Sequence, residues 1–400
     1  MLAPGTRAFT ILLGALTGLT ALSVDMSLPA LPQLTAVFAA TPDEAQLTLS
    51  VFLIGFAVGQ LFFGPLSDRF GRRPVLLGGL ALYAMGGALC AASPSLGMLV
   101  LGRLVQGLGG CVGRVMGPAI VRDSFSAQAG AQTLSHITQV VALAPLIAPT
   151  IGGFLLTFAG WRAIFVLLAL CGIGLLIVTA TKFAESSRFR DAQATQLPML
   201  LRNYGRFLSH RTCLGYLLVN CCVFAGLFSY ISGSSFVFID AFGVSSQVYG
   251  LIFGATAFAL TIGAALNGRL VRRHKPQRIL KLGLVVVLAG GVALLLWAKL
   301  APSILGVTLP MMVFVFGMGL VMPNATAAAM EPMPRMAGLA SSLLGSSQMA
   351  VGSLVGVLVN RFYDKTPTAM ATGIGAAAIA AILVYLLMIR GLARGGAAPG

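Results

Sequence analysis

The stretch from Gly64 to Pro74 reads GPLSDRFGRRP and places Asp68, Arg69, Arg72 and Arg73 within six positions. The segments on either side, LTLSVFLIGFAVGQLFF and VLLGGLALYAMGGALCAA, contain no charged residue. Because only 9% of the chain is charged, this cluster between two uncharged segments needs a physical cause. A short loop between two membrane-spanning helices provides one, since charged side chains are costly in the hydrocarbon core and are tolerated at helix ends.

The composition of the whole chain indicates a multi-pass membrane protein. Hydrophobic residues make up 58% of its 400 positions, and 49 positions are glycine, which is outside the usual range for soluble proteins. A helix needs about 20 apolar residues to cross a hydrocarbon core of roughly 30 Å. We predict twelve such spans in an all-α integral membrane fold, near residues 8–28, 45–64, 75–93, 97–119, 131–157, 162–181, 212–238, 248–268, 279–298, 303–325, 337–360 and 368–389.

The first apolar stretch follows Arg7, so a cleaved secretory signal is an alternative to a first span. No convincing small-residue cleavage site follows it, and cleavage would leave eleven spans with the wrong distribution of charge. We therefore expect the first span to remain in the protein.

The net charge of +16 would suggest a nucleic-acid partner in a soluble protein. In a membrane protein, the positions of the basic residues distinguish a nucleic-acid surface from membrane topology, because cytoplasmic loops carry an excess of lysine and arginine. With the amino terminus inside, the inner segments hold 20 of the 26 basic residues, and the outer loops are nearly bare. We therefore expect both termini in the cytoplasm, contact with the lipid bilayer and no nucleic acid.

The cysteines and histidines give no sign of a metal or a disulfide. All six cysteines fall within predicted spans, without a Cys-x-x-Cys pair and without a histidine at ligand spacing. We therefore expect no metal, no cofactor and no disulfide. Separately, we expect the chain to act as a monomer.

The longest inner segment separates six spans from six. We predict an amino-terminal bundle at 1–181, a cytoplasmic linker at 182–211 and a carboxy-terminal bundle at 212–400. Within the linker, LPMLLRNYGRFL has apolar and basic faces at helical spacing, which predicts a short helix lying on the membrane surface.

A weak internal repeat supports two related halves. A shift of 204 residues places Gly64 on Gly268 and Gly152 on Gly356. Such a repeat is expected if two six-helix bundles arose from one, and the binding site of such a protein lies between the halves near the bilayer midplane.

Two charged residues in the outer halves of their spans form the strongest candidate site. Asp25 lies ~5 Å from the outer end of its span, and Arg103 lies ~9 Å from the outer end of its own. An acid that alternates between facing an arginine and facing solvent can bind and release a proton, since positive charge favours ionisation and desolvation favours protonation. We hypothesise that Asp25 carries a transported proton and that Arg103 tunes it; a static ion pair is the alternative.

A third charge in a span, Arg114, lies eleven residues after Arg103, about three turns and ~20° around the helix. Both arginines are therefore expected on the same side. Arg114 either extends a polar cavity inward or reaches the inner headgroups, and the sequence leaves both interpretations open.

The charges of the opening loop also have two interpretations. They anchor the loop on the inner side, or Asp68 caps a helix end while Arg72 pairs with an acid on a neighbouring helix, for which Asp123 is available.

Several motifs together resemble one family. The loop resembles the loop 2-3 signature of the major facilitator superfamily, with Gly64, Asp68, Arg69, Gly71, Arg72 and Arg73 at the expected positions. LGRLVQGLGG (101–110) resembles the motif of its fourth span, and APLIAPTIGGFL (144–155) resembles the fifth-span motif associated with antiporters. Three further stretches resemble the Bcr/CflA subfamily of drug:proton antiporters: SVDMSLPALPQL (23–34), SYISGSSFVFID (229–240) and MAGLASSLLG (336–345).

This resemblance implies two pseudo-symmetric six-helix bundles and roles for particular residues. It implies that Asp68, Arg72 and Asp123 form a charge network that locks the two halves on the inner side. It also places a functional acid and arginine at Asp25 and Arg103.

For the substrate cavity, the resemblance points to the first and seventh spans, and the candidates are Asp25, Arg103, Arg114, Phe224, Phe228 and Tyr230. Aromatic walls with few polar anchors suit varied amphipathic compounds, although helix packing is the alternative for the three aromatic residues.

The fifth span contains two prolines and two adjacent glycines. Pro145, Pro149, Gly152 and Gly153 predict a kinked and closely packed gate helix, because the prolines remove backbone hydrogen bonds and the glycines allow close approach. Ala148 stands where the family usually has glycine before proline.

These features predict a proton-driven efflux transporter of a bacterial inner membrane that exports small amphipathic, antibiotic-like compounds. A proton-linked importer or a dedicated metabolite exporter on the same scaffold is the alternative, because a fold does not fix the direction of transport. An integral membrane enzyme would need clustered acids or a phosphate-binding motif, and the ten acids are scattered. A sensor without transport would leave the charges within the spans unexplained.

Overall fold

The computed structural model describes residues 2–187, 197–333 and 337–389. These residues form helices joined by short turns, with no strand among them. Twelve helical segments in this part of the chain are long and apolar enough to cross a membrane: Arg7–Phe38, Pro42–Phe70, Arg72–Ala91, Leu96–Ser124, Gln128–Ala159, Trp161–Lys182, Arg211–Ala241, Ser246–Leu270, Pro276–Leu300, Ile304–Met330, Ala340–Arg361 and Thr368–Ile389. The prediction of twelve spans in an all-α membrane fold is confirmed.

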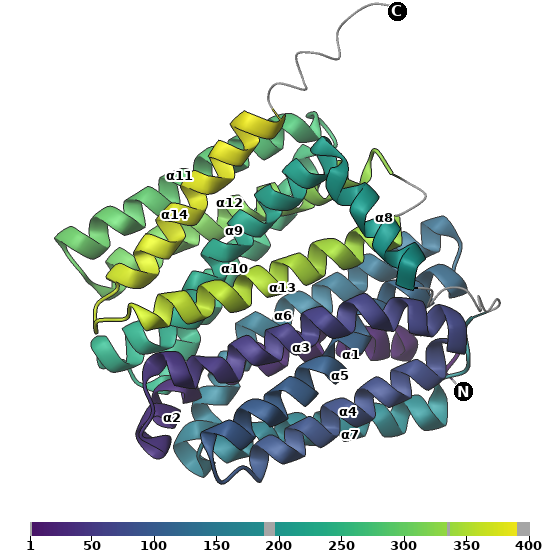
Figure 1. Cartoon of the computed structure of the whole chain (residues 1–400), viewed down its shortest axis with the longest axis horizontal. Coiled ribbons are helices and arrows are strands. Elements are labelled where there is room, and N and C mark those ends of the chain that lie inside the picture. The colour runs from purple at the N-terminus through teal and green to yellow at the C-terminus, as the bar shows by residue number, and fades with distance from the viewer. Residues whose placement is uncertain (1, 188–196, 334–336, 390–400) are drawn as a thin grey trace, which may run out of the picture. The chain divides into compact units, whose positions relative to one another are not determined.

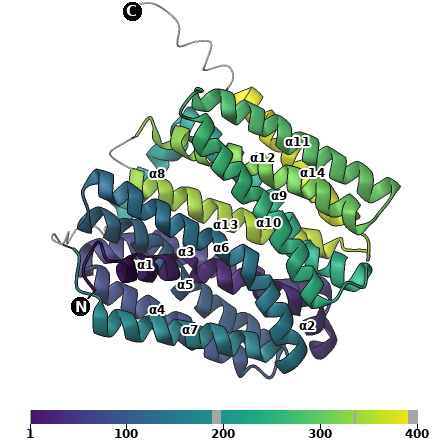
Figure 2. The ribbon, with the colours of Figure 1, turned by 180° about the vertical axis from the view of Figure 1, so that it is seen from behind.

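The chain divides into two compact units: unit 1 is Met1–Gln196 with Ser245–Leu251, and unit 2 is Leu197–Val244 with Ile252–Gly400. The helices from Arg7 to Lys182 are α1 (Arg7–Asp25), η1 (Leu28–Ala30), α2 (Leu31–Phe38), α3 (Pro42–Phe70), α4 (Arg72–Ala91), α5 (Leu96–Ser124), α6 (Ala127–Ala159) and α7 (Trp161–Lys182). Within unit 1, α5 packs against α1, α3 and α4, and Figures 1 and 2 show α4 alongside α5 and α7.

The helices that follow are α8 (Leu197–Ser209), α9 (Arg211–Ser235), η2 (Phe236–Ala241), α10 (Ser246–Leu270), α11 (Pro276–Leu300), α12 (Ile304–Met330), α13 (Ala337–Arg361), α14 (Thr368–Val384) and η4 (Tyr385–Ile389). In unit 2, α9 contacts α12, α13 and α14, and α11 contacts α12 and α14. The helix α8 lies at the position where the sequence pattern predicts a short amphipathic helix.

Local sequence signals explain where several helices begin. Thr41 and Glu44 form a capping box at the start of α3, in which the Glu44 carboxylate accepts a hydrogen bond of 2.8 Å from the Thr41 amide. The side chains of Ser95 and Ser303 cap the amino-terminal ends of α5 and α12. These polar residues satisfy amides that have no partner within the helix.

The first span is longer than the sequence prediction, which placed its end near residue 28. The α-helix does end at Asp25, but the chain continues through η1 and α2 to Phe38. Pro29 and Pro32 are the second residues of these two short helices and so lie in their first turns. Proline is favoured there because its fixed φ suits a first turn and its missing amide is not needed. Asp25 therefore lies deeper within its span than predicted.

The seventh span ends in a π-helical turn, η2, which continues α9 to Ala241. The Tyr363 hydroxyl lies 2.9 Å from the Phe236 carbonyl oxygen and 3.0 Å from Asp240 Oδ2 and donates to these acceptors. Burial, together with the Asp240 charge, raises the pKa of Tyr363 well above its ordinary value, so the hydroxyl remains a donor at neutral pH. The chain segment after α13 is thereby bound to the end of the seventh span.

Candidate functional site

Arg103 of α5 holds the segment of α1 that contains Asp25. Its guanidinium Nη2 donates to the Ser23 carbonyl oxygen at 3.3 Å and to Ser27 Oγ at 3.4 Å. These acceptors lie two residues before and two residues after Asp25. The Arg103 side chain is wholly enclosed, and Asp25 is only 5% exposed. The end of α1 is therefore fixed to α5 through Arg103.

The other donors of Arg103 reach neutral groups as well. Nε donates to the Thr48 carbonyl oxygen of α3 at 3.1 Å, and Nη1 donates to Gln106 Oε1 at 2.9 Å. The guanidinium carbon lies 4.3 Å from the centre of the Phe52 ring, where the face of the ring attracts a cation. Carbonyl oxygens, an amide and an aromatic ring therefore stabilise this buried charge.

Asp25 itself is not the counter-ion of Arg103 in this conformation. Among the residues that the structure describes, neither a hydrogen bond nor an ion pair is formed by the Asp25 carboxylate. The static Asp25–Arg103 ion pair, which was the alternative at the level of sequence, is thus not observed. Arg103 positions the backbone around Asp25 and leaves the carboxylate uncommitted.

The helix α6, which the sequence predicts to be a gate helix, packs directly beside this site. A Cβ atom on Gly152 would overlap the carbonyl oxygen of Met26, which directly follows Asp25, so only glycine allows this approach. The helix is continuous through Pro145 and Pro149, and Gly153 follows Gly152 in the same span. The structure therefore brings the predicted gate helix to the chain segment that carries the predicted proton site.

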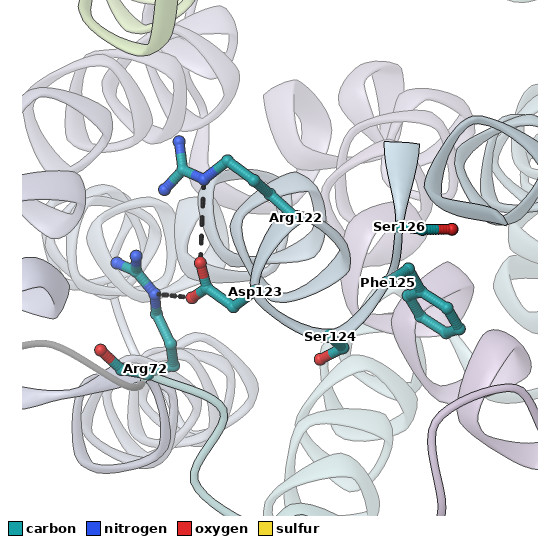
Figure 3. Close-up of a pocket in the computed structure, with 7 residues that line it drawn as sticks. Arg72, Arg122, Asp123, Ser124, Phe125 and Ser126 are labelled. Atoms are coloured by element: carbon teal, nitrogen blue, oxygen red, sulfur yellow. Dashed lines mark hydrogen bonds and ion pairs between the residues drawn. The ribbon is translucent and has the colours of Figure 1, made fainter. Parts of the chain in front are cut away.

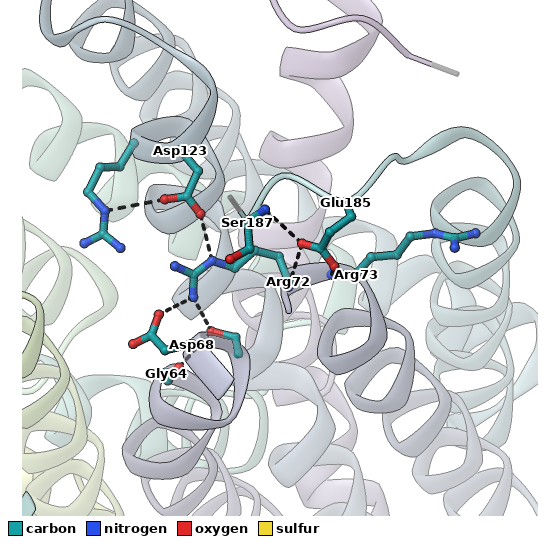
Figure 4. Close-up of polar contacts among 9 residues, drawn as sticks. Gly64, Asp68, Arg72, Arg73, Asp123, Glu185 and Ser187 are labelled. Carbon is teal, nitrogen blue, oxygen red and sulfur yellow. Dashed lines mark hydrogen bonds and ion pairs between the residues drawn. The ribbon is translucent and has the colours of Figure 1, made fainter. Parts of the chain in front are cut away.

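The structure brings Asp68, Arg72 and Asp123 together in unit 1 (Figure 4). Arg72 Nε donates to Asp123 Oδ2 at 2.8 Å, and Arg72 Nη1 donates to Asp68 Oδ1 and Ser67 Oγ, both at 2.6 Å. The Arg72 side chain is 6% exposed, whereas the Asp68 side chain is 46% exposed. The charge network thus joins the end of α3, the start of α4 and the end of α5.

Glu185, which the sequence analysis missed, extends this network. It lies just beyond α7, and its two carboxylate oxygens accept hydrogen bonds from the Arg72 amide at 2.9 Å and the Arg73 amide at 3.1 Å. The same carboxylate accepts from the Ser187 amide at 2.9 Å. The carboxylate occupies the positive end of α4, where amides have no partner within the helix. An acid in a basic segment could have marked Glu185 as a binding residue. The sequence could not show its partner, because the Arg73 amide is 112 residues distant.

The remaining residues of the loop motif have separate contacts. Gly71 has φ +100° and lies between α3 and α4, and a Cβ atom there would come 2.6 Å from Glu185 Oε2. Arg73 Nη2 donates to the Ala180 carbonyl oxygen at 2.7 Å, and the Arg69 guanidinium lies over the Phe70 ring. Gly64 lies in the last third of α3, where no atom would crowd a Cβ within 3.4 Å.

The substrate-cavity candidates of the seventh span are packed within unit 2. The rings of Phe224 and Phe228 are 4.8 Å apart, and Tyr230 stacks on Phe253 at 5.5 Å. The Tyr230 hydroxyl accepts a hydrogen bond of 3.3 Å from Thr256 Oγ1. All three candidates are buried, so in this conformation they contribute to helix packing.

Arg114 differs from Arg103 in exposure although both lie on α5. Arg103 is enclosed, and Arg114 is exposed in the isolated chain. Exposure agrees both with a polar cavity and with contact to headgroups, so the role of Arg114 stays open between these two interpretations.

The cysteines of the chain are free thiols, of which Cys90, Cys111, Cys213 and Cys221 are buried. In the described part of the chain, no group of three or more histidine, cysteine, aspartate or glutamate side chains has a geometry that could hold a metal ion.

Comparison with known proteins places the chain in a transporter family. Residues 13–357 match the family model of the Major Facilitator Superfamily. A bicyclomycin resistance protein homolog of Haemophilus influenzae is 32% identical over 383 residues, which cover 96% of either chain. Multidrug resistance protein D of Escherichia coli is 30% identical over 327 residues, which cover 80% of either chain. Both relatives are transporters rather than enzymes by fold and family.

Solved structures agree on the fold. The xylose transporter XylE from E. coli, in an inward-open conformation, superposes with a TM-score of 0.74 at 16% identity, covering 95% of this chain and 96% of that chain. At this identity the likeness bears on the fold alone. The chain therefore belongs to the Major Facilitator Superfamily, and its relatives are of the bicyclomycin- and multidrug-resistance kind that the Bcr/CflA resemblance predicted.

Proposed function

We propose that this chain is a proton-driven efflux transporter of the bacterial inner membrane, which exports small amphipathic, antibiotic-like compounds in exchange for protons. Membership of a transporter family and relatives named for bicyclomycin and multidrug resistance support the substrate class. The direction of transport, the proton coupling and the cytoplasmic location of both termini are part of this proposal.

One observation carries the proton coupling: a buried carboxylic acid lies within the first span, beside a buried arginine that it does not neutralise. Arg103 binds Ser23 and Ser27 on either side of Asp25, and the Asp25 carboxylate has no partner among the described residues. A carboxylate that is already paired would resist protonation. An uncommitted acid held in a fixed position is free to take up and release a proton.

The surrounding contacts suggest how the proton is coupled to movement. The backbone that follows Asp25 packs against Gly152 of α6, so a change in the charge or hydration of Asp25 acts beside the gate helix. Exchange of a proton for a cationic or polar substrate group at this position would make the two bindings compete. Alternating access then moves the site from one side of the membrane to the other.

On the inner side, the network of Asp68, Arg72 and Asp123 would act as a conformational lock between the halves. Within unit 1 it fixes three helix ends to one another, so a movement of the loop requires breaking two ion pairs of a buried arginine. Loss of such pairs in one conformation and their recovery in another would give a two-state element.

Proton antiport is tested in inverted vesicles with an acidic interior, in which the release of protons is followed as compounds are added. The native protein should release protons with selected compounds, and Asp25→Asn should not. Asp364→Asn is the matched control, because Asp364 is an exposed acid beyond the eleventh span that accepts bonds only within its own turn. Equal release by Asp25→Asn contradicts the assignment of the proton site. Absence of release from the native protein across a broad panel would favour an importer or a dedicated metabolite exporter.

A further inference from the structure

A cavity with a volume of about 370 Å³ lies within unit 2, and its size suits a small organic molecule. It lies among the start of α9, the start of α11 and the end of α12. The charge distribution predicts that these helix ends face the cytoplasm. The walls include Tyr216, Pro276, Leu280, Asn324, Ala327 and Glu331.

The acid of this cavity lacks the arginine that the corresponding acid of unit 1 has. In unit 1, Arg72 at the start of α4 lies 2.8 Å from Asp123 at the end of α5 (Figure 3). The shift of 204 residues in the internal repeat places Arg72 on Pro276, the first residue of α11. It places Asp123 on Ala327, four residues before Glu331. The start of α11 therefore supplies no arginine side chain that could neutralise Glu331.

Oxygen acceptors line the cavity from α12. The Asn324 amide nitrogen donates to Asn267 Oδ1 at 2.6 Å and to the Leu320 carbonyl oxygen at 2.7 Å. Both of its hydrogens are thus used, and Asn324 offers its Oδ1 to the cavity. Ala328 also lines the cavity. The residue four positions after it is Pro332, which has no N–H to donate to the Ala328 carbonyl oxygen. A ligand that binds here therefore meets acceptors and needs donors.

Tyr216 and Glu331 add a hydroxyl and a carboxylate to these acceptors. Tyr216 is only 7% exposed, and among the described residues its hydroxyl forms no hydrogen bond. Glu331 directly follows α12, and its charge acts on the Tyr216 hydroxyl. In the described part of the chain, no basic side chain lines the cavity and none pairs with Glu331. A buried hydroxyl without a partner and a carboxylate without a cation both point to a ligand that brings the cation.

We propose that this cavity binds an organic ammonium ion with an apolar body, as a substrate that is loaded from the cytoplasm. The ammonium would donate to the Glu331 carboxylate and to the oxygen atoms of Asn324 and Ala328, at the negative end of α12. The apolar body would lie against Pro276 and Leu280. This inference rests on the proposed export of amphipathic compounds and adds a second binding site, selective for cations, on the inner side.

Protection of a cysteine placed in the cavity wall tests this site. Gln277 is exposed and lines the cavity, so a water-soluble methanethiosulfonate reagent should modify Gln277→Cys. The probe is dansylcadaverine, a primary ammonium on an apolar ring system, and N-pentyl dansylamide is the matched neutral compound. In neutral detergent, dansylcadaverine at about ten times its dissociation constant should slow the modification about tenfold. The neutral compound should need a concentration about tenfold higher for the same protection.

Glu331→Gln, added to Gln277→Cys, removes the charge and keeps the size of the side chain. It should raise the dissociation constant of dansylcadaverine about tenfold, because a hydrogen bond to a charged group is lost. Asp364→Asn is the matched control, since Asp364 is an exposed acid of unit 2 outside the cavity, and it should leave the dissociation constant unchanged.

The possible results separate this site from the proposed function. Equal protection by the two dansyl compounds, protection that Glu331→Gln leaves unchanged, or no protection at any soluble concentration overturns the site. Equal slowing at a cysteine placed outside the cavity, as in Asp364→Cys, would show general adsorption and also overturns it. Selective protection of Gln277→Cys in a protein that exchanges no compound for protons would instead contradict the proposed export and leave the site in place.

Discussion

Replacing Arg103 by lysine should destabilise unit 1 although the charge is conserved. Arg103 uses three separate nitrogens: Nε for Thr48 of α3, Nη1 for Gln106, and Nη2 for Ser23 of α1 and for Ser27 just beyond its end. A lysine has one ammonium nitrogen on a shorter stem, so it cannot reach both α1 and α3. Hydrogen bonds to charged groups contribute about 1.5–3 kcal/mol each. With the bonds to Thr48 and Gln106 lost and the two to Ser23 and Ser27 retained, we expect a loss on the order of 3–6 kcal/mol of stability, less whatever a bound water restores.

The buried cysteines supply the assay. Cys90 and Cys111 are fully enclosed in unit 1, so a thiol-reactive fluorophore labels them as the protein unfolds on heating. The labelling midpoint of Arg103→Lys should fall by many degrees. Arg162→Lys is the matched control, because Arg162 donates a single hydrogen bond within the described residues, to the Ser93 carbonyl oxygen at 3.0 Å, and an ammonium can replace it. A midpoint for Arg103→Lys within a degree or so of the native value would refute the idea that Arg103 bridges α1 and α3.

Four further substitutions test the contacts of the loop and of the seventh span. Glu185→Gln should lower the labelling midpoint by a few degrees, because one amide oxygen cannot replace two carboxylate oxygens at the start of α4; an unchanged midpoint would show that the contact is dispensable. Gly71→Ala should be poorly tolerated, since its positive φ costs about 1–2 kcal/mol for a residue with Cβ, whereas Gly64→Ala should be neutral; equal effects in an expression and midpoint comparison would be contrary to this. Tyr363 has a raised pKa, so its contribution is present below pH of about 10 and is lost as pH rises further; Tyr363→Phe should therefore flatten the alkaline decline of the midpoint, and an identical decline would argue against it.

The sequence predicts the membrane fold well because a span is a local property. About twenty apolar residues between charged ends are recognisable without knowledge of the neighbours, and each of the twelve predicted spans has a helical counterpart. The end of the first span was misplaced for a local reason as well. Pro29 and Pro32 follow the predicted end at residue 28, but each lies in the first turn of a short helix that continues the span.

The site was less predictable because its contacts are distant in sequence. The presence of Asp25 and Arg103 in spans was visible, but which groups Arg103 binds depends on the rotation of α1 and α3 about their axes. Its acceptors on Ser23 and Thr48 are backbone oxygens, which every residue carries and no pattern marks. Glu185 was missed for the same reason, since it binds backbone amides across 112 residues. For Tyr230 the residue itself was recognised as a candidate, but its role was not. An aromatic residue type alone could not distinguish a cavity wall from helix packing.

Proton release on substrate binding tests the central claim most directly. The purified protein in weakly buffered detergent solution receives a transported compound, and a pH indicator reports the protons released for each protein molecule. The account predicts release by the native protein and by Asp364→Asn, and none by Asp25→Asn, even when binding is saturated. Undiminished release by Asp25→Asn would contradict the assignment of the transported proton to Asp25.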